Sequence, residues 1–143
     1  MSPASRSLEC WAPRYARLAL GAAFLSGIAS RFGLWGPGRG YGTFANFMKY
    51  TAQVNSFMPA RSIPFLAWAA TAAELALGLA LLLPLPSRAG RAVALSSALL
   101  LAAFGLAMAI SLGPKEPLDY SVFSASAAAL LVALHPVPET EVP

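Results

Sequence analysis

One acidic residue lies within an apolar segment, where burying an ionisable group costs free energy. Glu74 is the only charged residue between Pro64 and Leu85, a segment rich in alanine and leucine. A carboxylate near the centre of a bilayer costs roughly 2.5–3.5 kcal/mol on insertion scales, and such groups usually serve a function. We therefore predict Glu74 as the candidate catalytic residue, acting as a proton relay or a ligand contact. An interhelical hydrogen bond from the neutral acid, to Thr71, Ser97 or another polar group, is an equal alternative.

Three further residues complete the predicted binding set. Thr71 and Gly78 lie about one helical turn on either side of Glu74, so the three share one helix face. Arg31 follows the first apolar segment. We expect its guanidinium to snorkel to the membrane interface, and it would reach Glu74 only if that end of the helix is drawn inward. The predicted binding residues are thus Glu74, Thr71, Gly78 and Arg31.

The sequence has one cysteine, Cys10, and one histidine, His135. No disulfide can form within the chain, and a cysteine- or histidine-rich metal site has too few ligands. We predict no metal, and the residues by themselves indicate no cofactor. His135 lies at a predicted helix end, where a cation suits the helix dipole. Asp119 is expected to cap the start of the last apolar helix.

The composition indicates lipid as the solvent of these helices. The 143 residues are 57% hydrophobic and 11% charged, whereas soluble domains carry about 25% charged residues. The net charge is +4. The arginines stand at the ends of apolar segments, where they meet lipid headgroups. We therefore predict the lipid bilayer as a partner and no nucleic acid.

The apolar segments predict an all-α integral membrane four-helix bundle in one domain, residues 1–143. A helix needs about 20 apolar residues to cross the hydrocarbon. The second and third segments are long enough by themselves, and the first and fourth are marginal. A secretory signal at 18–30 is a less favoured alternative for the first. The predicted spans cover about residues 15–36, 63–84, 90–113 and 117–135.

An amphipathic helix is predicted at about residues 41–58, between the first two spans. Its apolar residues recur at steps of three and four, which is the period of one helix face. We expect this helix to lie in the membrane interface or to fold over the mouth of the bundle. The residues of the stripe are Phe44, Phe47, Thr51, Val54 and Met58.

Four crossings place both termini on one side of the membrane. The positive charges are equal in number on the two sides: one side has Arg6, Arg14, Arg17, Arg88 and Arg91, and the other has Arg31, Arg39, Lys49, Arg61 and Lys115. Position decides between them, because Arg14, Arg17, Arg88 and Arg91 crowd the helix ends within short segments. Short cytoplasmic segments carry the excess of Lys and Arg in membrane proteins. We therefore predict a protein of the plasma (inner) membrane with both termini in the cytoplasm.

The chain resembles the DoxX family of small membrane proteins over about residues 14–135. The resemblance rests on Phe24, Gly27 and Arg31 in the first helix and on Met58-Pro59 at the end of the amphipathic segment. It rests above all on residues 73–79, Ala-Glu-Leu-x-x-Gly-Leu, which contain Glu74. The wider group is similar to the DoxD subunit of thiosulfate:quinone oxidoreductase.

The resemblance implies a four-helix membrane bundle linked to redox chemistry, with a peripheral oxidoreductase as partner and a quinone as the cofactor it would suggest. The expected function is a membrane subunit or scaffold of an oxidoreductase system, accessory rather than catalytic. The alternative is a small membrane transporter or proton-coupled channel. That reading requires a homo-oligomer, because four short helices enclose little polar lining.

Overall fold

The computed structural model describes residues 3–135, without the side chains of residues 3–8 and of Cys10. All regular structure within 3–135 is helical, which confirms the all-α part of the predicted fold class. The predicted domain extends to residue 143, so its last eight residues lie outside the described part. The elements are α1 (Pro3–Arg31), α2 (Phe44–Val54), η1 (Ala60–Ser62), α3 (Ile63–Leu82), α4 (Ser87–Leu112), α5 (Lys115–Asp119) and α6 (Val122–Leu134).

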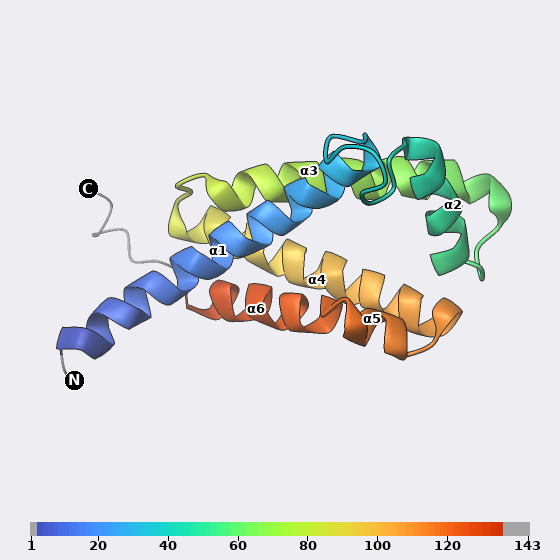
Figure 1. Ribbon diagram of the computed structural model, residues 1–143. Helices are drawn as coiled ribbons and strands as arrows, with labels where there is room; N and C mark the ends of the chain where they lie inside the picture. The colour runs from blue at the N-terminus through green and yellow to red at the C-terminus, as the bar shows by residue number, and fades with distance from the viewer. Residues whose placement is uncertain (1–2, 136–143) are drawn as a thin grey trace.

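The long helices pack as two pairs, α1 with α3 and α4 with α6 (Figure 1). The two pairs meet along contacts of α1 with α6 and of α3 with α4. The start of α1, the end of α6 and the α3–α4 turn lie at one end of the molecule. Helix α2 lies at the opposite end, where it packs on α3 and α4.

Within the described residues, two helices are long and apolar enough to cross a membrane. They are the continuous stretch Ala60–Leu82, which joins η1 to α3, and helix α4. A helix of 26 residues is about 39 Å long, which exceeds the roughly 30 Å of bilayer hydrocarbon. Only 28% of the apolar window is buried in each of them. Much of their apolar surface therefore faces outward, including Leu79 and Leu99.

Small residues allow the helices to approach closely. Ala94 and Ala98 are 0% and 6% exposed on the face of α4 that enters the core. A Cβ atom built on Gly78 would stand 3.1 Å from Cβ of Phe24. Close approach of α1 to α3 thus depends on the absence of a side chain at Gly78.

Helix α1 ends at Arg31, whereas the predicted first span continued to residue 36. The chain then folds back on the end of the helix. The backbone N–H groups of Tyr41 and Gly42 donate to the side chain and the carbonyl of Ser30, both at 3.0 Å. Gly40 has φ +65°, and a Cβ there would stand 1.9 Å from Oγ of Ser30. The glycine-rich loop therefore wraps the end of α1, which a longer helix would not allow.

Helix α2 is shorter than the predicted segment 41–58. The side chain of Thr43 caps its start by accepting from the backbone N–H of Asn46. Phe47, Thr51 and Val54 are buried, as the stripe predicts. The periodicity of the sequence therefore predicted the buried face of α2, whereas the start of the helix is determined by the Thr43 cap.

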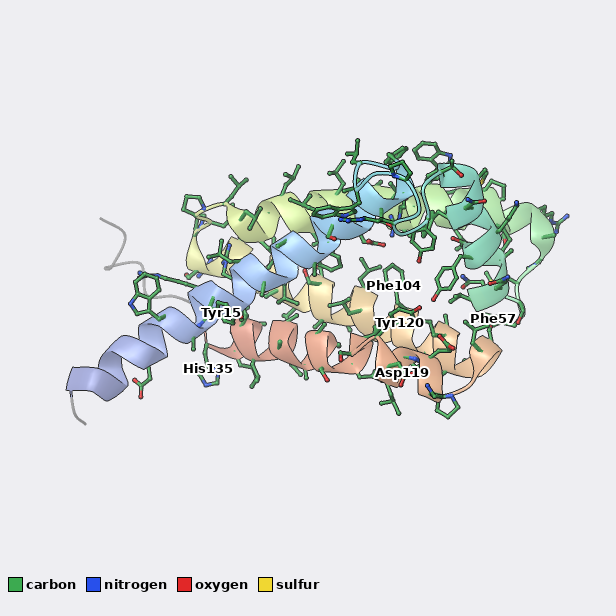
Figure 2. The ribbon with its side chains drawn as sticks, in the orientation of Figure 1. Tyr15, Phe57, Phe104, Asp119, Tyr120 and His135 are labelled. Atoms are coloured by element: carbon green, nitrogen blue, oxygen red, sulfur yellow. The ribbon has the colours of Figure 1, made fainter. Side chains whose placement is uncertain are left out.

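The predicted last span, 117–135, is broken in two, and the expected cap at Asp119 is wrong. Asp119 is the last residue of α5 and pairs with Lys115 one turn earlier. The helix starts again only after Ser121, which has a left-handed φ of 54° and makes no side-chain cap bond. The break places Tyr120 at the end of α5, near Phe104 of α4 (Figure 2).

Candidate functional site

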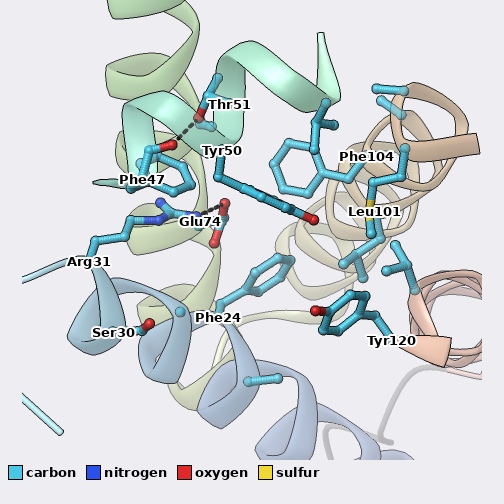
Figure 3. A pocket seen from close by; sticks show the side chains of 18 of the residues that line it. Phe24, Ser30, Arg31, Phe47, Tyr50, Thr51, Glu74, Leu101, Phe104 and Tyr120 are labelled. Carbon is cyan, nitrogen blue, oxygen red and sulfur yellow. Dashed lines mark hydrogen bonds and ion pairs between the residues drawn. The ribbon is translucent and has the colours of Figure 1, made fainter. Parts of the chain in front are cut away.

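A cavity of about 840 Å³ lies between α1, α3 and α4, under α2 and beside the α5–α6 break. Figure 3 shows its aromatic side chains converging on one space. Most of the lining is apolar, and the charged side chains are Arg31 and Glu74. Other lining side chains include Phe24, Ser30, Tyr41, Phe47, Tyr50, Thr51, Leu101, Phe104, Met108 and Tyr120.

Glu74 and Arg31 form an ion pair inside the protein. The Nη2 atom of Arg31 donates to Oε1 of Glu74 at 2.5 Å, and the two side chains are 6% and 7% exposed. The expectation that Arg31 snorkels outward is therefore wrong. Its side chain turns inward because it finds a carboxylate and a hydroxyl there, which offset the loss of water. Glu74 is accordingly held by an arginine, not by a serine or threonine of the predicted alternative.

Thr71 belongs to the same cluster. Its Oγ1 accepts from Nη1 of Arg31 at 2.9 Å and donates to the carbonyl of Ala67 at 2.7 Å. The guanidinium thus joins two residues that lie one turn apart on α3. The structure brings together three of the four predicted binding residues. The fourth, Gly78, packs against α1. Of the four, Arg31 and Glu74 line the cavity, whereas Thr71 and Gly78 do not.

Gly27 of α1 makes room for the carboxylate. A Cβ atom at this position would stand 3.3 Å from Oε2 of Glu74. Because Gly27 precedes Arg31 by one turn, both residues face α3. On the face of α1 that meets Glu74, Gly27 thus leaves space for the carboxylate and Arg31 supplies its cation.

Phe47 covers the guanidinium from the α2 side. The centre of its ring lies 3.8 Å from Cζ of Arg31, which is a cation–π contact. The ring of Tyr41 meets that of Phe47 edge-on at 5.2 Å. Helix α2 thus helps to exclude water from the ion pair. Nε of Arg31 remains buried without a hydrogen-bond partner in the described part of the chain.

Three tyrosines, Tyr41, Tyr50 and Tyr120, extend the polar part of the cavity, and none of them belongs to the predicted binding set. Burial raises the pKa of Tyr41 to about 12, with a smaller contribution from Tyr50. Burial, and then the neighbouring Tyr120 and Glu116, raise the pKa of Tyr50. Both phenols therefore stay protonated at neutral pH and can donate hydrogen bonds.

A periodicity signal for Tyr50 was present in the sequence. It lies three residues after Phe47 and four before Val54, so it belongs to the face that those residues bury. No comparable signal existed for Tyr120, because its position depends on the break before Ser121.

The arrangement offers apolar walls and a few polar groups, which suit the binding of a small molecule. Residues 3–135 contain no cluster of three His, Cys, Asp or Glu side chains that could hold a metal ion. The one carboxylate of the cavity is engaged by Arg31, so it is not poised as a free base. No family model, curated protein or solved structure matches this chain.

Proposed function

We propose that this chain is an integral membrane protein in which α1, α3, α4 and the α5–α6 segment form a four-span bundle. The support is that only 28% of the apolar window is buried in Ala60–Leu82 and in α4, so most of their apolar residues face outward. The soluble alternative would leave many large side chains in water, such as Leu99 at 72% and Ile110 at 70% exposure. Helix α2 would lie in the interface, over the cavity.

The same arrangement supports a plasma-membrane location with cytoplasmic termini. The start of α1, the end of α6 and the α3–α4 turn share one end of the molecule (Figure 1). Arg14, Arg17, Arg88 and Arg91 belong to these segments, and such positive charge marks the cytoplasmic side. The cavity and α2 would then lie toward the opposite face.

The function we propose is that of an accessory membrane subunit that binds a small apolar molecule for a redox system. The cavity carries this proposal: it is large, aromatic, and closed at one side by a buried ion pair. Sites for small molecules are typically apolar concavities of about 300–1,000 Å³ with a few placed polar groups. The resemblance to DoxX proteins supplies the redox part, with a quinone as the ligand it suggests and a peripheral oxidoreductase as partner.

Gentle purification tests this function. The protein would be extracted in mild detergent, and its bound small molecules identified by mass spectrometry. We expect a membrane-derived molecule in stoichiometric amount, together with an oxidoreductase that co-purifies. A chain that stays monodisperse in buffer without detergent would overturn the membrane assignment. A ligand-free protein that captures no partner would overturn the accessory role.

Glu74 favours a second candidate, a proton-coupled transporter built as a homo-oligomer, because a carboxylate lines the cavity. This candidate requires the pair with Arg31 to open during transport. In proteoliposomes, a transporter would carry a proton flux that Glu74→Gln abolishes. The subunit proposed above would show no such flux with either sequence.

A further inference from the structure

The charges of the cavity cancel. Arg31 and Glu74 are the charged side chains among the residues that line it, and they are bound to each other. An anionic ligand would compete with Glu74 for the guanidinium, whereas a cationic ligand would compete with Arg31 for the carboxylate. Either ligand would leave one buried charge without its partner, which is strongly unfavourable. The site therefore suits an uncharged molecule.

The polar groups of the lining include donors that a ligand oxygen could use. Nε of Arg31 is buried without a partner in the described residues, although its side chain lines the cavity. Burying a donor without an acceptor is costly, so a bound molecule with an acceptor gains by satisfying it. Tyr50 and Tyr120 add two hydroxyl groups that point into the same space from opposite sides (Figure 3). A ligand oxygen that accepts hydrogen bonds matches this set.

The walls between these donors are aromatic. Phe24 comes from α1, Tyr50 from α2 and Phe104 from α4, and all three line the cavity. Aromatic rings pack favourably in offset or edge-on arrangements. A flat ring system would therefore use these walls better than a flexible chain of the same volume.

We propose, on the basis of the ligand-binding function above, that the cavity takes an uncharged, flat, ring-containing molecule with one or more acceptor oxygens. Its ring packs among Phe24, Tyr50 and Phe104. Its oxygens accept hydrogen bonds from Arg31 and from the hydroxyls of Tyr50 and Tyr120. Tyr120 is 66% exposed while it lines the cavity, so it marks the mouth.

Three probes separate the elements of this proposal. They are 2-methyl-1,4-naphthoquinone, which is uncharged, its 2-hydroxy analogue, which is an anion at neutral pH, and 2-methylnaphthalene, which has no oxygen. Binding is measured by equilibrium dialysis of the detergent-solubilised full-length protein against matched empty micelles. We expect the uncharged quinone to bind about ten-fold more tightly than the hydrocarbon, since it satisfies a buried donor. The anion binds weakest.

Variants assign the binding to this cavity. Ala107→Phe fills the space from α4, because Ala107 lines it. It should abolish binding of the uncharged quinone. Leu99→Phe, on the exposed side of the same helix, should bind as the parent does. Tyr50→Phe keeps the ring and removes the hydroxyl, so it should weaken the quinone several-fold and leave the hydrocarbon unchanged. This variant serves also if Ala107→Phe fails to fold.

The outcomes separate the ligand class from the function on which it rests. Equal binding of the quinone and the hydrocarbon would overturn the need for an acceptor, and tightest binding of the anion would overturn the charge argument. In both cases the binding function would stand, provided that Ala107→Phe or Tyr50→Phe alters the binding. If none of the probes binds in a way that depends on these residues, the ligand-binding function itself fails.

Discussion

Arg17 and Arg31 belong to the same helix and reach the same neighbour, yet they serve different ends. They are 14 residues apart, which is nearly four turns, so they lie about 21 Å apart on almost the same face of α1. Arg17 donates from Nε to the carbonyl of Leu81 at 3.1 Å and from Nη2 to that of Leu83 at 2.8 Å. It thus satisfies carbonyls that the end of α3 leaves without partners.

Arg31 meets α3 in its middle, where the backbone carbonyls are already used within the helix. Its partners are therefore the side chains of Thr71 and Glu74, and its Nε has no hydrogen-bond partner within residues 3–135. The comparison teaches that the type of residue does not decide its role. Arg17, over a helix end, binds backbone carbonyls that lack partners. Arg31, over a helix interior, pairs with an acidic side chain and keeps a donor that a ligand can use.

The largest effect should follow from removing the buried cation. Arg31→Met leaves the Glu74 carboxylate without its partner, which we expect to lower the free energy of unfolding by about 3–5 kcal/mol. Unfolding in mixed detergent micelles, followed by circular dichroism, measures it. The double variant Arg31→Met with Glu74→Leu should recover most of the loss, because no charge is then stranded. A single variant as stable as the parent would show that the pair is not buried.

The next effect concerns the space that Gly27 provides. Gly27→Val places atoms against Oε2 of Glu74, where even a Cβ would stand at 3.3 Å. We expect a loss of about 1–3 kcal/mol, typical of overpacking, together with weaker binding of the uncharged naphthoquinone. Thermal unfolding and dialysis measure the two effects. Gly27→Ala serves as the smaller step, and an unchanged Val variant would argue against the close approach of α1 and Glu74.

Substitution of Arg17 should lower the stability of the protein without changing ligand binding. Arg17→Gln removes charge-assisted hydrogen bonds to the end of α3, and Arg17 is only partly buried, so we expect a loss of about 1–2 kcal/mol. Binding of the naphthoquinone should remain unchanged, in contrast to Arg31→Met. Parallel unfolding and dialysis of the two variants provide the test. Equal loss of binding in both would erase the distinction between the two arginines.

The smallest effect is a pH dependence near the site. The pKa of Tyr41 is raised from 10.0 to about 12, so the folded protein holds this proton more tightly than the unfolded chain. Its contribution to stability is complete below pH 10 and is lost as the pH rises through 12. Tyr41→Phe should flatten the stability profile in that window. Ultraviolet titration of the phenols measures the shift, and a Tyr41 that ionises near pH 10 would contradict it.

The sequence was most informative at two kinds of position: apolar residues spaced at the period of a helix, and a charged residue within an apolar segment. The buried face of α2 followed from the spacing of Phe47, Thr51 and Val54, and Glu74 was found because its position is so unfavourable. The all-helical fold is confirmed, while the DoxX resemblance and the redox link stay predictions. These rest on a pattern of residues, and nothing in the geometry of the chain is specific to them.

The remaining parts depended on local competition that a sequence pattern does not resolve. Arg31 could point to the interface or inward, and Thr71 and Glu74 offer it hydrogen-bond partners on the inward side. Asp119 could cap the next helix or pair with Lys115 one turn earlier, and in the structure it pairs with Lys115. Tyr120 lines the cavity because the helix is interrupted between α5 and α6, and the sequence pattern did not predict that interruption.

In the proposed four-span bundle, the division between α5 and α6 would also affect the surrounding lipid. Helix α6 has 13 residues, which span about 20 Å, some 10 Å less than the hydrocarbon of a typical bilayer. A short hydrophobic segment draws the headgroups inward and thins the membrane around it. The leaflet beside Tyr120 should accordingly be dimpled, so that an amphiphile dissolved in lipid reaches the protein at a point where the bilayer is already shallow.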